Sequence, residues 1–164
     1  MIFYYLDASA WVKRYYQETG TSWVQALFVD RSTIACASLG LIEVMATLAR
    51  KAKARQISRA QLTRKVGDLE EDWEHLVQIH LTTEVVNRAK NITRHQALRG
   101  ADAVHLASAL LLQSRFVEPD DRLVFVVSDR ELKGAAQSSG LEAVDPEERE
   151  KAVAPQPEKE EPES

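Results

Sequence analysis

The sequence has a single cysteine, Cys36, which excludes an intramolecular disulfide and a zinc site made of several thiolates. No apolar run approaches the roughly 20 residues that a membrane-spanning helix needs, so we expect no membrane segment. The first residues, MIFYYLDAS, carry no basic segment and reach an acid at Asp7, unlike a signal peptide. A glycine-rich phosphate loop and a Cys/His metal cluster are also missing. From these absences we expect a cytoplasmic protein.

The composition is that of a globular protein, since 45% of the 164 residues are hydrophobic and 28% are charged. The net charge of −4 is unevenly distributed, because residues 145–164 hold eight acids against three bases. This last segment is also rich in proline and glutamate and shows no apolar periodicity. The sequence therefore predicts one domain over residues 1–145, followed by a disordered acidic tail over residues 146–164.

A basic stretch interrupts the charge balance in the middle of the chain. No acid occurs between Glu43 and Asp68. The bases of this interval are Arg50, Lys51, Lys53, Arg55, Arg59, Arg64 and Lys65. Two interpretations are open: the stretch is the solvated face of a helix, or it binds an anionic partner.

Short apolar runs alternate along the chain with longer segments of helical periodicity. The runs predict strands over residues 1–6, 34–38, 78–81, 122–127 and 141–144. The other segments predict helices over residues 8–18, 22–29, 39–53, 59–77, 83–98, 101–113 and 130–138. Ser58 and Gln61 form a capping-box pattern before one of them. Strands that alternate with helices indicate a three-layer α/β/α fold with a mainly parallel central sheet.

Four acids stand alone in apolar surroundings. They are Asp7, Glu43, Asp102 and Asp129. The first two are the only charged residues of segments 1–12 and 32–49, and the third is the only acid of segment 85–117. The fourth follows the most hydrophobic strand. An isolated carboxylate in such a setting protonates, pairs or binds a metal, although each one taken singly can also be a helix cap or a hydrogen-bonded core acid.

The expected topology brings these acids to one edge of the sheet. Asp7 and Asp129 follow strands, Asp102 begins a helix, and Glu43 lies about one turn into another helix. Proteins of the α/β class place their sites at this edge. Carboxylates that meet there repel one another unless a cation binds, and oxygen ligands without thiolates suit Mg²⁺ or Mn²⁺. Together with a basic surface, such a cation site points to phosphodiester cleavage.

Four motifs together resemble the PIN-domain ribonucleases, and most of all the VapC-type toxins of bacterial and archaeal toxin–antitoxin pairs. The motifs are Asp7-Ala-Ser9, Glu43, the segment RGADAVHLASA from Arg99 to Ala109, and the segment VVSDREL from Val126 to Leu132. The resemblance covers about residues 2 to 145. It implies a PIN-like fold, in which Asp7, Glu43, Asp102 and Asp129 are the catalytic ligands of Mg²⁺ (or Mn²⁺).

Two neighbours of these acids are expected to assist them. Ser9 would hydrogen-bond Asp7 or a substrate phosphate; the other interpretation, a cap for the following helix, is compatible with that role. Arg99 would contact phosphate or neutralise the acids, or else only begin its helix. His105 is interpreted as a hydrogen-bonded core histidine rather than as a general base.

The last motif departs from the pattern of the family. The family often has a hydroxyl residue two positions before its last acid, where this chain has Val127. Ser128 is adjacent to the acid instead, and Glu131 is a possible substitute for Asp129 as a ligand.

The resemblance implies a Mg²⁺-dependent endoribonuclease that leaves a 3′-hydroxyl and a 5′-phosphate. It also implies an RNA substrate, a cognate antitoxin whose C-terminal segment docks on the groove, and a homodimer. The basic stretch would then steer RNA or receive an acidic antitoxin segment. The alternative is a catalytically silent PIN-like module that binds RNA or protein. A phosphatase of the haloacid-dehalogenase kind would need a second aspartate two residues after Asp7, where this chain has Ser9.

Overall fold

The computed structural model describes residues 1–153, within which five strands and eight α-helices are found. The strands are β1 (Ile2–Leu6), β2 (Thr33–Ala37), β3 (Val77–Ile79), β4 (Arg122–Val126) and β5 (Glu142–Val144). The helices are α1 (Ala8–Trp11), α2 (Thr21–Val29), α3 (Ser38–Lys53), α4 (Arg59–His75), α5 (Thr83–His95), α6 (Gly100–Phe116), α7 (Arg130–Ser138) and α8 (Pro146–Val153), with a 3₁₀ turn, η1 (Val12–Arg14), after α1. No helix among these residues combines the length and hydropathy of a membrane-spanning segment.

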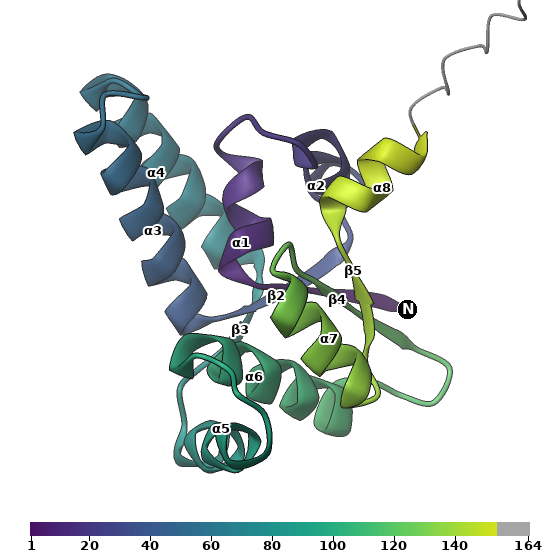
Figure 1. Ribbon diagram of the computed structural model, residues 1–164. Coiled ribbons are helices and arrows are strands. Elements are labelled where there is room, and N and C mark those ends of the chain that lie inside the picture. Colours follow the sequence, from purple (N-terminus) through teal and green to yellow (C-terminus); the bar gives the residue numbers. More distant parts are fainter. Residues whose placement is uncertain (154–164) are drawn as a thin grey trace, which may run out of the picture.

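The strands form one sheet in the order β3-β2-β1-β4-β5, and every neighbouring pair is parallel. The longest pairing joins β1 to β4, where Ile2 lies opposite Arg122 and Leu6 lies opposite Val126 (Figure 1). The strands at the centre are continuous apolar runs because both of their faces are buried. The expectation of a mainly parallel sheet is confirmed.

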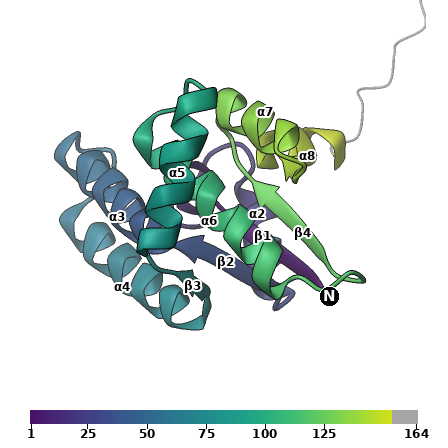
Figure 2. The same ribbon diagram turned by 90° about the horizontal axis from the view of Figure 1, so that it is seen from below.

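Helices cover both faces of the sheet, so the expected three-layer α/β/α arrangement is confirmed (Figures 1 and 2). Side chains alternate along each strand, and Tyr5 and Leu6 therefore enter different cores. The core on the side of Tyr5 is completed by α5, α6 and α7. The core on the side of Leu6 is completed by α1, α2, α3 and α4, and it contains the buried Cys36.

Helices α3 and α4 pack against each other as a hairpin that extends away from the sheet, and we call this hairpin, residues 38–75, the arm (Figures 1 and 2). The expected capping box begins its second helix: the Gln61 amide donates to Ser58 Oγ at 3.0 Å, and the Ser58 amide donates to Gln61 Oε1 at 2.7 Å. Ile57, in the turn between the two helices, is buried. The arm is therefore an ordered part of the fold.

The expectation of one helix over residues 8–18 is wrong, because α1 ends at Trp11 and the 3₁₀ turn ends at Arg14. The chain leaves the helix where Lys13 becomes buried, with an exposed fraction of 3%. Its Nζ donates to the Thr19 carbonyl at 2.9 Å and to Glu18 Oε1 at 3.2 Å. These bonds require the following loop to fold back over the lysine.

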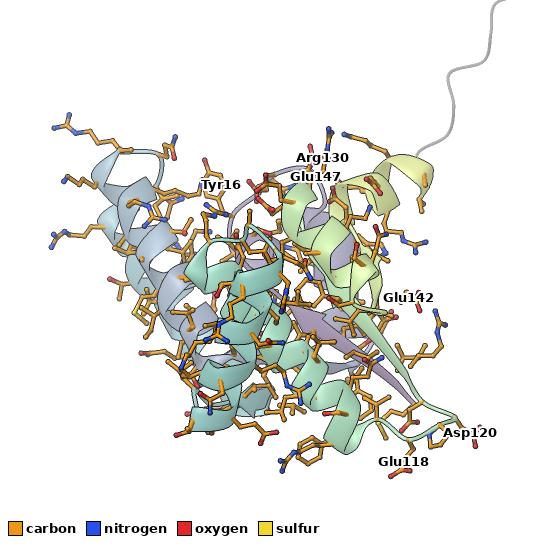
Figure 3. All side chains as sticks on the ribbon, turned by 60° about the horizontal axis from the view of Figure 1, so that its bottom comes forward. Tyr16, Glu118, Asp120, Arg130, Glu142 and Glu147 are labelled. Carbon is orange, nitrogen blue, oxygen red and sulfur yellow. The ribbon has the colours of Figure 1, made fainter. Side chains whose placement is uncertain are left out.

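The expectation of disorder from residue 146 onward is wrong for residues 146–153, which form α8 (Figure 3 labels Glu147 on it). Helix α8 lacks an apolar stripe, and its carboxylates bind it to the rest of the fold instead. Glu147 Oε1 lies 3.1 Å from Lys13 Nζ, and Glu150 accepts bonds from the amides of Gly20 and Ser22 at the start of α2. Residues 154–164, the rest of the segment expected to be disordered, lie outside the described residues.

Candidate active site

Asp7 is the most buried of the four singled-out acids, with an exposed fraction of 4%. It directly follows β1 and caps α1, accepting a bond from the Ala10 amide at 3.0 Å. Ser9 Oγ lies 2.7 and 2.9 Å from its two carboxylate oxygens. Burial is the main reason that the pKa of Asp7 rises to about 6, while neighbouring His105 opposes the rise. Within residues 1–153, no basic side chain forms an ion pair with this carboxylate.

Asp102 lies in the first turn of α6 with an exposed fraction of 8%. Its negative charge contributes to the raised pKa of Asp7, so the two carboxylates interact electrostatically. Arg99 Nε donates to Asp102 Oδ2 at 3.0 Å, and another nitrogen of the same guanidinium lies 3.7 Å from Asp129 Oδ2. The side chain of Arg99 is 76% exposed. Arg99 therefore neutralises two of the acids from the solvent side.

Asp129 follows β4, the strand next to β1, and caps α7 by accepting a bond from the Leu132 amide at 2.8 Å. The preceding amide, of Ser128, donates to Ser9 Oγ at 3.0 Å. Ser9 thus connects the loop after β4 to the carboxylate of Asp7. The alternative role of Ser9 as a helix cap is wrong, because Asp7 is the cap of α1. A contact of Ser9 with substrate stays a prediction.

Glu43 reaches the same region from α3 and is held by a histidine. Its Oε1 lies 2.6 Å from His105 Nε2, and His105 Nδ1 lies 2.9 Å from the Tyr5 hydroxyl. His105 is 1% exposed, as expected for a hydrogen-bonded core histidine. The sequence did not predict its contact with Glu43, although His105 lies three residues after Asp102 on the same side of α6.

A groove of about 560 Å³ runs between α1 and α3. Its lining includes Ser9, Lys13, Glu43, Arg50 and Ser128. The hydroxyl of Ser128 is buried and has no hydrogen-bond partner in the described part of the chain. A buried hydroxyl without a partner is costly, so this group is available to water or to a bound molecule. That Lys13 lines this groove was not predicted from the sequence, because no local pattern marks it.

The donor set suits a hard cation, because four carboxylates approach one edge of the sheet and the single thiol belongs to the core. However, among residues 1–153, no three Asp, Glu, His or Cys side chains converge closely enough to hold a metal ion as they stand. All four carboxylates are turned to protein partners instead: Asp7 accepts from a hydroxyl and an amide, Asp102 from Arg99, Asp129 from an amide, and Glu43 lies against His105. The ligand roles of the acids, and of Glu131 as a substitute, stay predictions.

Comparison with known families identifies the chain. A model of the PIN domain family matches residues 4–127. The chain belongs to the PIN domain family. Ribonuclease VapC49 of Mycobacterium tuberculosis strain H37Rv is 38% identical to it over 136 residues, which cover 83% of this chain and 90% of that protein.

Solved structures of other proteins share the fold of this chain. A toxin–antitoxin complex from Klebsiella pneumoniae matches with a TM-score of 0.59 at 16% identity, covering 87% of this chain and 96% of that one. VapC20 of Mycobacterium tuberculosis, described as a sarcin-ricin loop cleaving toxin, matches with a TM-score of 0.57 at 13% identity, covering 80% and 94%. At these identities the likeness concerns the fold.

Proposed function

We propose that the protein is a Mg²⁺-dependent endoribonuclease and the toxin of a toxin–antitoxin pair. The observation that carries the proposal is the buried pair Asp7 and Asp102, whose charges interact at the carboxyl edge of the sheet. Buried acids whose charges repel one another are costly unless a cation joins them. Membership of the PIN family and 38% identity to a protein named a ribonuclease support the choice of RNA as substrate.

Asp7, Asp102, Glu43 and Asp129 would hold the cation, Mg²⁺ or Mn²⁺. When bound, such an ion activates a water molecule and stabilises the negative charge that develops on the phosphate. Ser9 fixes the orientation of the Asp7 carboxylate by bonding both of its oxygens. Arg99 carries an exposed guanidinium beside the acids and is suited to bind a phosphate oxygen. The expected products carry a 3′-hydroxyl and a 5′-phosphate.

The test combines cleavage with direct cation binding. Wild type should cleave RNA in Mg²⁺ or Mn²⁺ and stop when the cation is chelated, and calorimetry should detect Mn²⁺ binding. Asp102→Asn should lose both, while Asp120→Asn, which changes an exposed turn acid, should keep both. If wild type continues to cleave RNA in a chelator, the proposed dependence of cleavage on a divalent cation is rejected.

The alternative function is a catalytically silent module that binds RNA or protein. It is favoured by the finding that no three candidate ligands converge in residues 1–153. Wild type that binds RNA but neither binds Mn²⁺ nor cleaves would select this alternative.

The proposed partners are RNA, a cognate antitoxin and a second copy of the chain. The structural likeness to a chain of a toxin–antitoxin complex supports the antitoxin. Co-expression with the product of the neighbouring gene should yield a stable complex that suppresses cleavage. Light scattering on the purified protein should give the mass of a dimer.

A further inference from the structure

The arm carries a strongly basic surface that continues beyond the proposed site. We call Arg50, Lys53, Arg55, Arg59 and Arg64 the basic face; all five side chains are exposed. Within residues 1–153, none of the five forms an ion pair. Figure 3 shows nitrogen-tipped side chains projecting from the free end of the arm. These positive charges are therefore available to an anionic partner.

The basic face begins inside the groove of the candidate active site. Glu43, Thr47 and Arg50 all line that groove, and their spacing places them on one face of α3. At a rise of 1.5 Å per residue, Arg50 lies about 10 Å along the helix from Glu43, and the tip of the arm begins about 18 Å away. Arg50 therefore lies between the carboxylates and the basic side chains at the tip of the arm.

The remaining surface of the arm favours a nucleic acid over a protein. The arm exposes one large hydrophobic side chain, Ile42 at its base beside the groove, and none from Glu43 to Leu76. Protein interfaces depend on aromatic or apolar anchors at their centre. Contacts with a phosphate backbone instead use Arg, Lys, Ser and Thr side chains, and Thr47, Ser9 and Ser128 are the hydroxyl residues of the groove.

We propose that the basic face of the arm binds the phosphate backbone of the RNA substrate, beyond the nucleotides that lie at the carboxylates. The inference rests on the proposed nuclease function and names its second point of contact with RNA. An RNA long enough to reach the tip of the arm gains binding energy there. A trinucleotide spans only about 10 Å at the 3.4 Å rise of a stacked strand and does not reach it.

The test removes two charges at a time from the full-length chain. Arg55→Gln with Arg59→Gln changes the tip of the arm, and Lys90→Gln with Arg94→Gln removes two exposed charges from α5 as a matched control. RNA binding is measured by fluorescence anisotropy in EDTA, on the Asp102→Asn background, with an RNA hairpin and with a trinucleotide. Circular dichroism confirms that each variant is folded.

The tip pair should weaken hairpin binding about tenfold and lower the slope of log K against log salt by about 1.5, since each lost phosphate contact removes roughly 0.7 to 0.9. The trinucleotide affinity and the control pair should stay at the level of the parent. On the Asp102-intact background, the tip pair should raise KM for the hairpin and leave kcat unchanged.

Equal losses of hairpin affinity in the tip and control pairs, or no loss in either pair, would overturn the proposal. It would also be overturned if the tip pair lost affinity for a polyglutamate peptide but kept its affinity for RNA. The two proposals fail separately. If wild type cleaves RNA and the tip pair binds the hairpin as tightly as the parent, only the proposal about the arm is rejected. If the tip pair weakens RNA binding but wild type neither cleaves RNA nor binds Mn²⁺, only the nuclease proposal is rejected.

Discussion

His105 joins Glu43 to the core of the protein: its Nε2 lies 2.6 Å from Glu43 Oε1, and its Nδ1 lies 2.9 Å from the Tyr5 hydroxyl. Burial raises the pKa of Tyr5 well above its usual range, so the hydroxyl keeps its proton. It can therefore donate a hydrogen bond to Nδ1. The other ring nitrogen then carries its hydrogen and donates to the carboxylate. A half-buried acid on α3 is thereby held in one orientation by residues of β1 and α6.

Replacing His105 should therefore impair the candidate site more than the fold. In His105→Asn, the side chain is too short to reach Glu43, and we expect Mn²⁺ affinity and RNA cleavage to fall about 10–100-fold. The free energy of unfolding should fall by about 1–3 kcal/mol, because the Tyr5 hydroxyl loses its partner. Calorimetry, a cleavage assay and urea denaturation measure the three quantities.

Tyr5→Phe is the matched control for this prediction. It removes the hydroxyl and leaves the ring stacked on Phe125, whose centroid lies 5.3 Å away. Its effect on Mn²⁺ affinity should be smaller than that of His105→Asn. Equal Mn²⁺ affinity in wild type and His105→Asn would show that the histidine only fills space.

Gly40 allows α3 to lie close to this histidine. A Cβ added to Gly40 would overlap Cys36 Sγ and would lie 3.1 Å from His105 Cε1. Gly40→Ala should therefore lower the free energy of unfolding by about 1–3 kcal/mol, as measured by urea denaturation. Gly67→Ala is the control, because nothing lies within 4 Å of its added Cβ and alanine favours the helix by about 1 kcal/mol. Loss of stability in both variants would contradict this explanation.

The raised pKa of Asp7 makes stability depend on pH in a defined direction. Its pKa is about 6 in the fold against 3.8 normally, so the folded chain holds the proton more firmly than the unfolded chain. The contribution of Asp7 to stability is therefore full below about pH 4 and is lost as the pH rises through about 6. Asp7→Asn has no such loss, and its stability relative to wild type should increase by about 2–3 kcal/mol between about pH 4 and pH 7.

Urea denaturation across this pH range tests the prediction, with Asp120→Asn as a variant whose profile should follow that of wild type. Excess Mg²⁺ should reduce the difference between wild type and Asp7→Asn, because a bound cation stabilises the ionised carboxylate. Parallel profiles for wild type and Asp7→Asn without Mg²⁺ would contradict the burial of an unpaired charge.

Helix α8 offers two acids that should respond differently to neutralisation. Glu147 contacts the buried ammonium of Lys13 at 3.1 Å, whereas Glu148 contacts Lys133 on the surface at 2.6 Å. Glu147→Gln should lower the free energy of unfolding by about 1–2 kcal/mol, since a buried charge loses one of its partners. Glu148→Gln should leave the urea midpoint unchanged, because exposed pairs contribute little. A larger effect of Glu148→Gln would contradict the role given to Lys13.

The parts of the fold that the sequence predicted are those governed by local patterns. The strands are apolar runs, and Ser58 and Gln61 form the expected cap. Asp7 and Asp129 follow neighbouring parallel strands, whose carboxyl ends lie at one edge of the sheet. The isolated acids were visible because a charge inside an apolar segment is a strong compositional signal.

The features that sequence reasoning missed depend on contacts between distant segments. The early end of α1 is set by the bonds of Lys13, including one to Glu147, more than a hundred residues away. Helix α8 has no apolar stripe from which the sequence could predict it. Its Glu150 accepts hydrogen bonds from amides at the start of α2. The orientation of Glu43 depends on His105, and such side-chain pairings leave no trace in a single sequence.

The place of β1 between β2 and β4 also determines when the carboxylate edge comes into existence. Asp7 follows β1, and β4, the strand that leads to Asp129, is synthesised more than a hundred residues later. Pairings so distant in sequence form late in folding, because a long loop must close first. The nascent chain therefore carries no assembled acidic edge until β4 has been synthesised, so the stretch of messenger RNA that encodes β1 to β4 is read before that edge exists.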